Sequence, residues 1–174
     1  TEAGFTSELG AEKFFNIKSR FGNLRTDAVV LVATIRALKY HGGAKLSNLQ
    51  NKDPEALKKG FENLDKHIEN MRWFGFRPVV AVNKFTSDTP DEIELLIQHC
   101  SNRNVMVAIN NSWADGGKGA VDLAMTVLKS IDNAENNFKP LYELSWSFEK
   151  KIETICKLMY GADHVEYALK AKSQ

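Results

Sequence analysis

The sequence predicts an α/β protein with a parallel sheet flanked by helices, and three short apolar runs support this prediction. The runs cover residues 28–33, 79–82 and 105–109, are rich in valine, and end at polar or turn-forming residues. Such runs are typical of strands that are buried on both faces of a sheet. Helical sequence follows each run, and strands that alternate with helices indicate βαβ units with right-handed connections.

The N-terminal part of the chain is predicted to contain a turn, a helix and the first strand. Small and polar side chains at residues 1–6 indicate the turn, and a helix over about residues 9–18 follows it. The strand at residues 28–33 leads into a short helical piece that ends before Gly42 and Gly43. Two adjacent glycines mark either a turn or a place where two backbone segments approach closely.

The middle of the chain is predicted to contain the longest helix, over about residues 53–74. An Asp-Pro-Glu sequence opens it, and Gly75 is a good stop signal. Its apolar residues recur at spacings of three and four, which gives one apolar face. After the strand at residues 79–82, residues 89–92 read Thr-Pro-Asp-Glu. A capping residue, proline at the first helical position and glutamate three residues after the cap predict a new helix there.

The C-terminal part departs from the βαβ pattern. Residues 141–144 and 165–167 are predicted to be short strands, and residues 148–160 to be an amphipathic helix that ends at Gly161. This combination predicts a small α+β C-terminal extension.

The division into domains follows from this change of pattern. Residues 132–137 form a polar break. We therefore expect residues 1–133 to form an α/β nucleotide- or folate-site domain, and residues 134–174 to begin a C-terminal α+β region.

Composition limits the possible functions. The 174 residues are 43% hydrophobic with a formal net charge of +1, so nothing indicates nucleic acid or an acidic membrane surface as a partner. No apolar stretch approaches the roughly 20 residues of a transmembrane helix. Cys100 and Cys156 lack CxxC spacing, and we expect two reduced thiols in a cytosolic protein. The first residues resemble neither a signal peptide nor a native start.

Two aromatic residues follow predicted strands in polar sequence. Phe85 comes after Asn83-Lys84, and Trp113 comes after Asn110 and Asn111. In open α/β sheets, ligands bind in the crevice outside the carboxyl ends of the strands. Two aromatics at that edge would clamp a flat ring, with a gain of about 1 kcal/mol beyond area burial. The alternative for Phe85 is that it packs under its own loop.

Other candidate motifs are weaker. Residues 116–119 read Gly-Gly-Lys-Gly, which is either an anion-binding turn at a helix start or an ordinary flexible turn. The spacing differs from GxxxxGK[ST] because Ala120 follows. Asn83-Lys84 resembles the Asn-Lys-x-Asp base-reading motif, with Thr86 in place of the aspartate. The four histidines share no metal-ligand spacing, so the residues alone predict a crevice for a flat ligand and no reaction.

Several segments together resemble the formate–tetrahydrofolate ligase family, also called 10-formyltetrahydrofolate synthetase. The resemblance covers essentially the whole chain. Its most specific segments are residues 1–5 (Thr-Glu-Ala-Gly-Phe), 30–39 with 41–43 (His-Gly-Gly), 79–85 (Val-Val-Ala-Val-Asn-Lys-Phe) and 113–119 (Trp-Ala-Asp-Gly-Gly-Lys-Gly).

The resemblance implies an activity and an architecture. Members of the family join formate to tetrahydrofolate at the expense of ATP, taken with Mg, through a formyl phosphate intermediate. Their sheet belongs to a three-layer domain similar to that of P-loop NTPases, and their P-loop lies N-terminal to the matched region. The 174 residues contain no such loop, so we expect an internal piece of a longer ligase, or a shortened relative, that is inactive by itself. A cytoplasmic homo-oligomer that binds small-molecule substrates is also implied.

The resemblance also implies roles for individual residues. The pterin-stacking aromatics of the family fall on Phe85 and Trp113, and Ile109 falls at another folate-lining position. Residues on the nucleotide or phosphate side fall on Glu2, Gly4, Thr34, Arg36 and Asn83. No catalytic residue is implied. One departure is Thr6, where the family usually has glycine, and a Cβ there would crowd a backbone that approaches a ligand closely.

Two functions remain open from the sequence. The first is a ligase segment that supplies the folate-facing half of the site. The alternative is a non-catalytic binding or assembly module derived from the same family.

Overall fold

The computed structural model describes residues 1–132 and 137–172 and separates into two compact units. One unit is Thr26–Asn137, and the other combines Thr1–Arg25 with Phe138–Gln174. The predicted break at residues 132–137 and the predicted domain boundary after residue 133 fall largely on residues 133–136, which lie outside the described residues. That division into domains stays a prediction.

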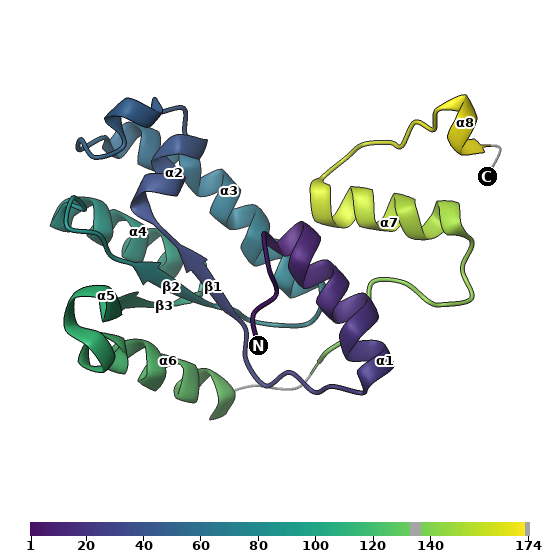
Figure 1. Cartoon of the computed structure of the whole chain (residues 1–174), viewed down its shortest axis with the longest axis horizontal. Helices are drawn as coiled ribbons and strands as arrows, with labels where there is room; N and C mark the ends of the chain where they lie inside the picture. The colour runs from purple at the N-terminus through teal and green to yellow at the C-terminus, as the bar shows by residue number, and fades with distance from the viewer. Residues whose placement is uncertain (133–136, 173–174) are drawn as a thin grey trace. The chain divides into compact units, whose positions relative to one another are not determined.

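Unit Thr26–Asn137 contains a parallel sheet of three strands in the order β1-β2-β3. The strands are β1 (Val30–Ala33), β2 (Val79–Asn83) and β3 (Met106–Asn110). Val80 on β2 pairs with Leu31 on one side and Val107 on the other. The prediction of three neighbouring parallel strands is confirmed, with strand ends that differ from the predicted ones by one or two residues (Figure 1).

The main core of this unit lies between the sheet and three helices. These helices are α2 (Ile35–His41), α3 (Pro54–Trp73) and α4 (Pro90–Asn102), with a single 3₁₀ turn, η3 (Leu46–Asn48), between the first two. Their apolar faces meet Val80 and Val82 in one cluster of buried side chains. The apolar positions predicted for the longest helix are all buried: Leu57, Phe61, Leu64, Ile68 and Met71.

The opposite face of the sheet is only partly covered. Helix α6 (Val121–Asp132) packs on β3 and β2, and Val79 and Ala81 on this face are fully buried. On β1, however, Val32 is 64% exposed. The prediction that this strand is buried on both faces is wrong, because β1 lies at the edge of the sheet and α6 packs over its neighbours.

Local signals explain where the helices begin. Thr89 caps α4, and its side chain and that of Glu92 form the reciprocal pair of a capping box, as predicted. Asp53 caps α3 by accepting a hydrogen bond from the Ala56 amide at 2.9 Å, and Pro54 is the first helical residue. Because these signals are local, the sequence alone was sufficient to place both helix starts.

Helices α2 and α3 approach each other closely, and glycines make this possible. A Cβ on Gly42 would lie 1.7 Å from the Ala56 carbonyl oxygen, and one on Gly60 would lie 1.8 Å from the Leu38 carbonyl oxygen. Gly43 takes a left-handed conformation with φ of +95°. The glycine pair was predicted to mark either a turn or a close approach of two backbone segments. Both occur, since Gly42 allows the close approach and Gly43 makes the turn.

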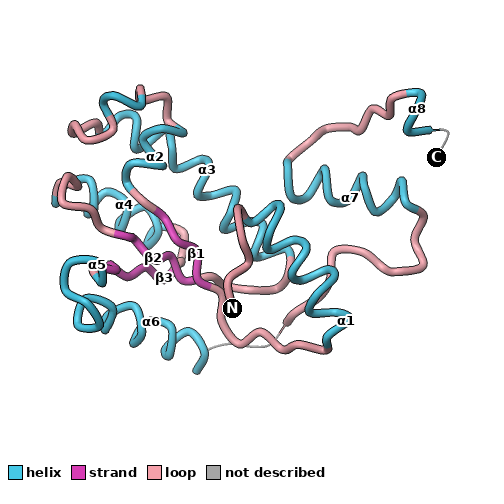
Figure 2. The backbone as a smooth tube through the Cα atoms, viewed as in Figure 1, coloured by secondary structure: helices cyan, strands magenta, loops and turns pink. Residues whose placement is uncertain are grey.

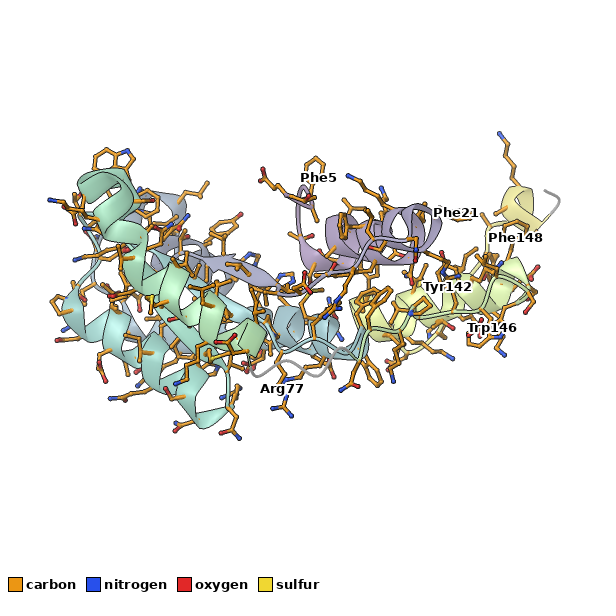
Figure 3. All side chains as sticks on the ribbon, turned by 90° about the horizontal axis from the view of Figure 1, so that it is seen from below. Phe5, Phe21, Arg77, Tyr142, Trp146 and Phe148 are labelled. Atoms are coloured by element: carbon orange, nitrogen blue, oxygen red, sulfur yellow. The ribbon has the colours of Figure 1, made fainter. Side chains whose placement is uncertain are left out.

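The other unit is built around a helical segment that begins at Ser7. It consists of the π-helical pieces η1 (Ser7–Ala11) and η2 (Phe14–Ser19) and the short α1 (Arg20–Gly22). The C-terminal part contributes α7 (Phe148–Tyr160), which ends at left-handed Gly161 as predicted, and α8 (Leu169–Lys172). Phe15, Leu141 and Met159 are its buried apolar residues. Figure 3 shows Phe5, Phe21 and Phe148 at the surface of this unit.

The predicted strands at residues 141–144 and 165–167 are wrong, since the structure has loops there. The first segment binds side chains in place of a neighbouring strand. The Leu141 amide donates to the Asn16 side chain at 2.9 Å, and the Tyr142 carbonyl accepts from Arg20 at 2.5 Å. Within residues 137–172 the structure contains helices and loops only, so the predicted α+β extension is helical. None of the helices in the described parts of the chain has the length and apolar character needed to cross a membrane.

Candidate functional site: the carboxyl edge of the sheet

The carboxyl ends of β1, β2 and β3 lie at the same edge of the sheet because the strands are parallel and adjacent (Figure 2). Three connections leave this edge. One leads from β1 into α2, one from β2 into α4, and one from β3 into α5 (Ser112–Asp115). Six of the predicted site residues belong to this edge or to these connections: Thr34, Arg36, Asn83, Phe85, Ile109 and Trp113.

Phe85 lies in the loop between β2 and α4 and is 40% exposed. Asp88 fixes its backbone, since one carboxylate oxygen accepts from the Phe85 amide at 2.8 Å and the Asp88 amide donates to the Phe85 carbonyl at 3.0 Å. The Arg36 guanidinium lies over the ring, 4.4 Å from its centroid. Part of the Phe85 surface is therefore covered by an arginine, and part is open to solvent.

Trp113 follows β3 and is 85% exposed. It lies on the short helix α5, in the polar sequence that follows the third predicted strand. The backbone amide of Ala114 closes this turn on the Asn111 carbonyl at 3.1 Å. An indole with this much exposed apolar surface gains from contact with a ligand or a partner.

A pair of asparagines joins the segments that carry the two aromatics. Asn83 and Asn110 are paired in the register of β2 and β3, and the Asn110 side-chain amide donates to the Asn83 side-chain oxygen at 2.8 Å. The Asn110 side-chain oxygen in turn accepts from the Ser112 amide at 3.2 Å. The start of the Phe85 loop and the start of α5 are thus linked by side-chain hydrogen bonds across the strand ends.

Thr34 and Ile109 have evident structural roles at this edge. The Thr34 hydroxyl caps α2 by accepting from the Ala37 amide at 3.1 Å. Ile109 is half-buried and packs against the main core between sheet and helices. Their predicted roles toward ligands stay predictions.

Glu2 and Gly4, the other predicted nucleotide-side residues, belong to the second unit. Both are exposed, in the segment that precedes η1. Gly10 packs directly on this segment, since a Cβ there would lie 1.6 Å from the Gly4 carbonyl oxygen. Thr6, where the family usually has glycine, has φ of −98°, a backbone conformation open to any residue, and its hydroxyl bonds Glu8 at 2.5 Å.

The glycine-rich segment is a 3₁₀ turn, η4 (Gly116–Ala120), directly before α6. A Cβ on Gly119 would lie 2.4 Å from the Asn111 carbonyl oxygen, and the Asn111 amide donates to the Gly119 carbonyl at 2.9 Å. These contacts explain why position 119 is glycine, since the turn packs so closely on the end of β3 that a side chain has no space. Anion binding at this turn stays a prediction.

A buried ion pair lies behind the edge. Lys39 on α2 and Glu92 on α4 are 3.1 Å apart, with side chains 1% and 0% exposed. Glu92 also accepts from the Asp53 amide at 2.9 Å, and Lys39 donates to the Asn51 carbonyl at 2.8 Å. Burial opposes ionisation of Glu92, but the Asp53 amide, Lys39 and Thr89 together hold its pKa below the ordinary value. The pair fixes α2 to the start of α4, and so joins two of the three connections.

A cavity of about 360 Å³ lies at the other edge of the sheet, near the amino ends of the strands. Its lining includes Asp27, Arg72, Phe76, Arg77, Asn104 and Met106. Figure 3 shows the Arg77 side chain pointing away from the body of the protein. Ligand crevices of open α/β sheets lie at the carboxyl edge, so we do not assign the site to this cavity. Among the described residues, no group of three acidic, histidine or cysteine side chains gathers as a metal site.

Sequence reasoning missed three residues that organise the edge: Ser87, Asp88 and Asn110. One signal was present for Asn110, because asparagine directly follows both the second and the third predicted strand, and equal positions on adjacent parallel strands lie side by side. Asp88 accepts from the amide three residues before it, the reverse of the forward Asx-turn pattern, so no clear signal for this contact was present in the sequence. Ser87 carried no signal, because its partner Arg36 is 51 residues away in the sequence.

Fold and site together define a parallel α/β domain that carries two exposed aromatic residues, Phe85 and Trp113, on the connections that leave the carboxyl edge of its sheet. A comparison with known families identifies it further. The family model for formate–tetrahydrofolate ligase matches residues 1–174, the whole chain. The chain belongs to the formate–tetrahydrofolate ligase family, a family of ligases of one-carbon folate metabolism whose substrates include ATP and tetrahydrofolate.

Proposed function

We propose that this chain supplies the folate-facing half of the active site of an ATP-dependent formate–tetrahydrofolate ligase. The observation that carries the proposal is the position of Phe85 and Trp113, each on the connection that leaves one of two adjacent parallel strands. Both side chains keep exposed ring surface, and the asparagine pair Asn83–Asn110 links the segments that hold them. A pterin stacked between the two rings would be held as bases are held on aromatic platforms.

The reaction proposed for the complete site has two steps. A formate oxygen attacks the γ-phosphorus of ATP, ADP leaves, and formyl phosphate forms. A folate nitrogen then attacks the formyl carbon, the carbon–oxygen bond to phosphate breaks, and phosphate leaves. The contribution of this chain is to hold the folate nitrogen close to the formyl carbon, since positioning converts a bimolecular step into an effectively unimolecular one. We propose no catalytic residue.

Within unit Thr26–Asn137, the nucleotide side of the site is proposed to involve Thr34 and Asn83. Thr34 and Asn83 lie at the carboxyl ends of β1 and β2, where backbone and short polar side chains meet ligands in open α/β sheets. ATP would enter as its Mg complex, as part of the substrate. A cytoplasmic location and a homo-oligomeric state are proposed from the family alone.

Calorimetry with tetrahydrofolate tests the folate-facing role. We expect the chain to bind tetrahydrofolate, and Trp113→Ala and Phe85→Ala each to weaken binding about 10- to 100-fold, the effect of about 1–3 kcal/mol per stacked aromatic. ATP affinity, measured on the complete reading frame, should change little. Trp73→Ala is the matched control, since Trp73 is a half-exposed tryptophan at the far end of α3. Unchanged folate binding in both site variants would contradict the proposal.

A further inference from the structure

The contact between Arg36 and the Phe85 loop gives Arg36 a specific place in the site. Arg36 is in the first turn of α2, and its guanidinium carbon lies 4.4 Å from the centroid of the Phe85 ring. Its Nε and Nη2 donate to the Ser87 hydroxyl oxygen at 3.3 and 3.1 Å. The guanidinium thus stacks on the ring and, through the same planar fork, bonds the loop two residues further on.

This geometry divides the two faces of the Phe85 ring. A cation over a ring occupies one face, since the attraction acts on the negative face of the π-system. Phe85 as a whole residue is nevertheless 40% exposed, so it keeps surface that a ligand can contact. An aromatic that is supported on one face by a fixed partner loses less freedom when a ligand stacks on the other.

Both Arg36 and the loop are themselves held in place. Three residues after Arg36, Lys39 makes the buried ion pair with Glu92 at the start of α4. The Phe85 loop is held by Asp88, whose carboxylate accepts a hydrogen bond from the Phe85 amide and so closes the turn of residues 85–88. The arginine and the ring are therefore carried by elements whose separation is fixed by buried and part-buried polar contacts.

We propose that Arg36 is a positioning residue for folate: it backs one face of Phe85 and holds the loop through Ser87, so that the pterin stacks on the opposite face. This inference rests on the proposed function. It differs from the nucleotide-side role that family resemblance implies for Arg36. In the structure, the Nε and Nη2 groups of Arg36 point toward Ser87, and the guanidinium plane lies over Phe85. The bonds to Ser87 use two of the five guanidinium N–H groups, so experiments on folate and ATP separately are needed to distinguish the two roles.

Three variants separate these roles, measured in the protein expressed as its complete reading frame. Arg36→Met keeps the length of the side chain and removes its charge, Arg36→Lys keeps the charge and loses the fork, and Ser87→Ala removes the hydrogen-bond acceptor. We expect Arg36→Met to raise Kd and KM for tetrahydrofolate about 3- to 10-fold, with a KM for ATP within about twofold of the parent. For Arg36→Lys and Ser87→Ala, we expect Kd and KM values for tetrahydrofolate between those of the parent and those of Arg36→Met. Lys45→Met, at an exposed lysine just beyond α2, is the control for loss of a positive charge.

Amide hydrogen exchange provides a readout that does not depend on folate. In Arg36→Met, the amides of residues 85–88 should exchange faster than in the parent, while those of β2 stay protected. A raised KM for ATP with an unchanged Kd for tetrahydrofolate would overturn the proposal in favour of the nucleotide-side role. Unchanged exchange and unchanged folate affinity would overturn it as well. A parent protein that fails to bind tetrahydrofolate would instead contradict the proposed function, and this inference with it.

Discussion

At the scale of single residues, the buried pair Lys39–Glu92 is the polar contact with the largest expected effect on stability. Both side chains are almost completely buried, and four groups contact the Glu92 carboxylate: Lys39, the Asp53 amide, and the amide and hydroxyl of Thr89. A buried pair of this kind adds little over a well-packed apolar pair, but removal of one partner leaves an uncompensated buried charge.

We therefore predict that Glu92→Gln lowers the free energy of unfolding by about 3–5 kcal/mol. Adding Lys39→Met should recover part of this loss, because the buried charge is then gone. Urea unfolding followed by circular dichroism measures both. A double variant no more stable than Glu92→Gln would show that the charge is not the cause.

The same carboxylate predicts a dependence of stability on pH. The pKa of Glu92 is lowered in the folded state, so its contribution is present above the ordinary value near 4.5 and is lost as pH falls through the lower folded-state pKa. The parent should lose stability in this acid range, and Glu92→Gln should lose less over the same range. If the free energy of unfolding falls equally with pH in both proteins, Glu92 is not the group responsible for the acid sensitivity.

The two cysteines are predicted to differ in reactivity. Burial, together with the Asp65 carboxylate, raises the pKa of Cys100 to about 11, whereas Cys156 is only half-buried. Since the thiolate is the reactive form, iodoacetamide at pH 8 should modify Cys156 in the folded protein and reach Cys100 only in denaturant. Mass spectrometry of the labelled peptides distinguishes the sites, and label on Cys100 under native conditions would contradict the prediction.

At the scale of the elements, the tight packing of α2 on α3 depends on glycine. A Cβ at position 60 meets a backbone carbonyl, which no rotamer change relieves. Gly60→Ala should lower the free energy of unfolding by about 1–3 kcal/mol despite the better helix propensity of alanine. Lys59→Ala, at an exposed position of the same helix, is the control and should be close to neutral. A Gly60→Ala variant as stable as this control would show that the helices move apart at no cost.

The elements also show what the sequence was sufficient to predict. The three strands, the capped starts of α3 and α4, and the end of α7 at Gly161 were predicted because each depends on signals within a few residues. The strands expected at 141–144 and 165–167 were wrong, because an extended apolar segment forms a strand only beside a partner. The first of these segments instead binds Asn16 and Arg20, more than 120 residues earlier in the sequence.

The same limit applies to the candidate site. The aromatics and asparagines at strand ends were visible as a pattern, since parallel strands bring equal positions together. The exposed face of β1 could not be predicted, because it depends on which helix covers which part of the sheet. The contact of Arg36 with Phe85 could not be predicted either, because the two residues are 49 positions apart in the sequence. Local chemistry in the sequence predicts the framework of the site, whereas its cross-loop contacts required the structure.

At the scale of the whole molecule, the last prediction is that folate binding and phosphoryl transfer depend on different parts of the ligase. Enzymes of the P-loop NTPase type surround the transferred γ-phosphoryl group with backbone amides and a lysine, which a GxxxxGK[ST] loop supplies. The 174 residues contain no GxxxxGK[ST] sequence. We therefore expect the purified 174-residue chain to bind tetrahydrofolate and to release no ADP when ATP and formate are added.

A coupled assay for ADP, with and without formate, measures this, and calorimetry on the same preparation reports folate binding. Trp113→Ala should lower the heat of folate binding and leave the ADP background unchanged, so that the two activities are scored separately. A complete ligase of the same family, assayed in parallel, shows that the conditions support turnover. Formate-dependent ADP release by the 174-residue chain itself would mean that groups within it, and not a P-loop, hold the γ-phosphate, and Lys84 and Lys118 near the carboxyl edge would then be the first cations to replace.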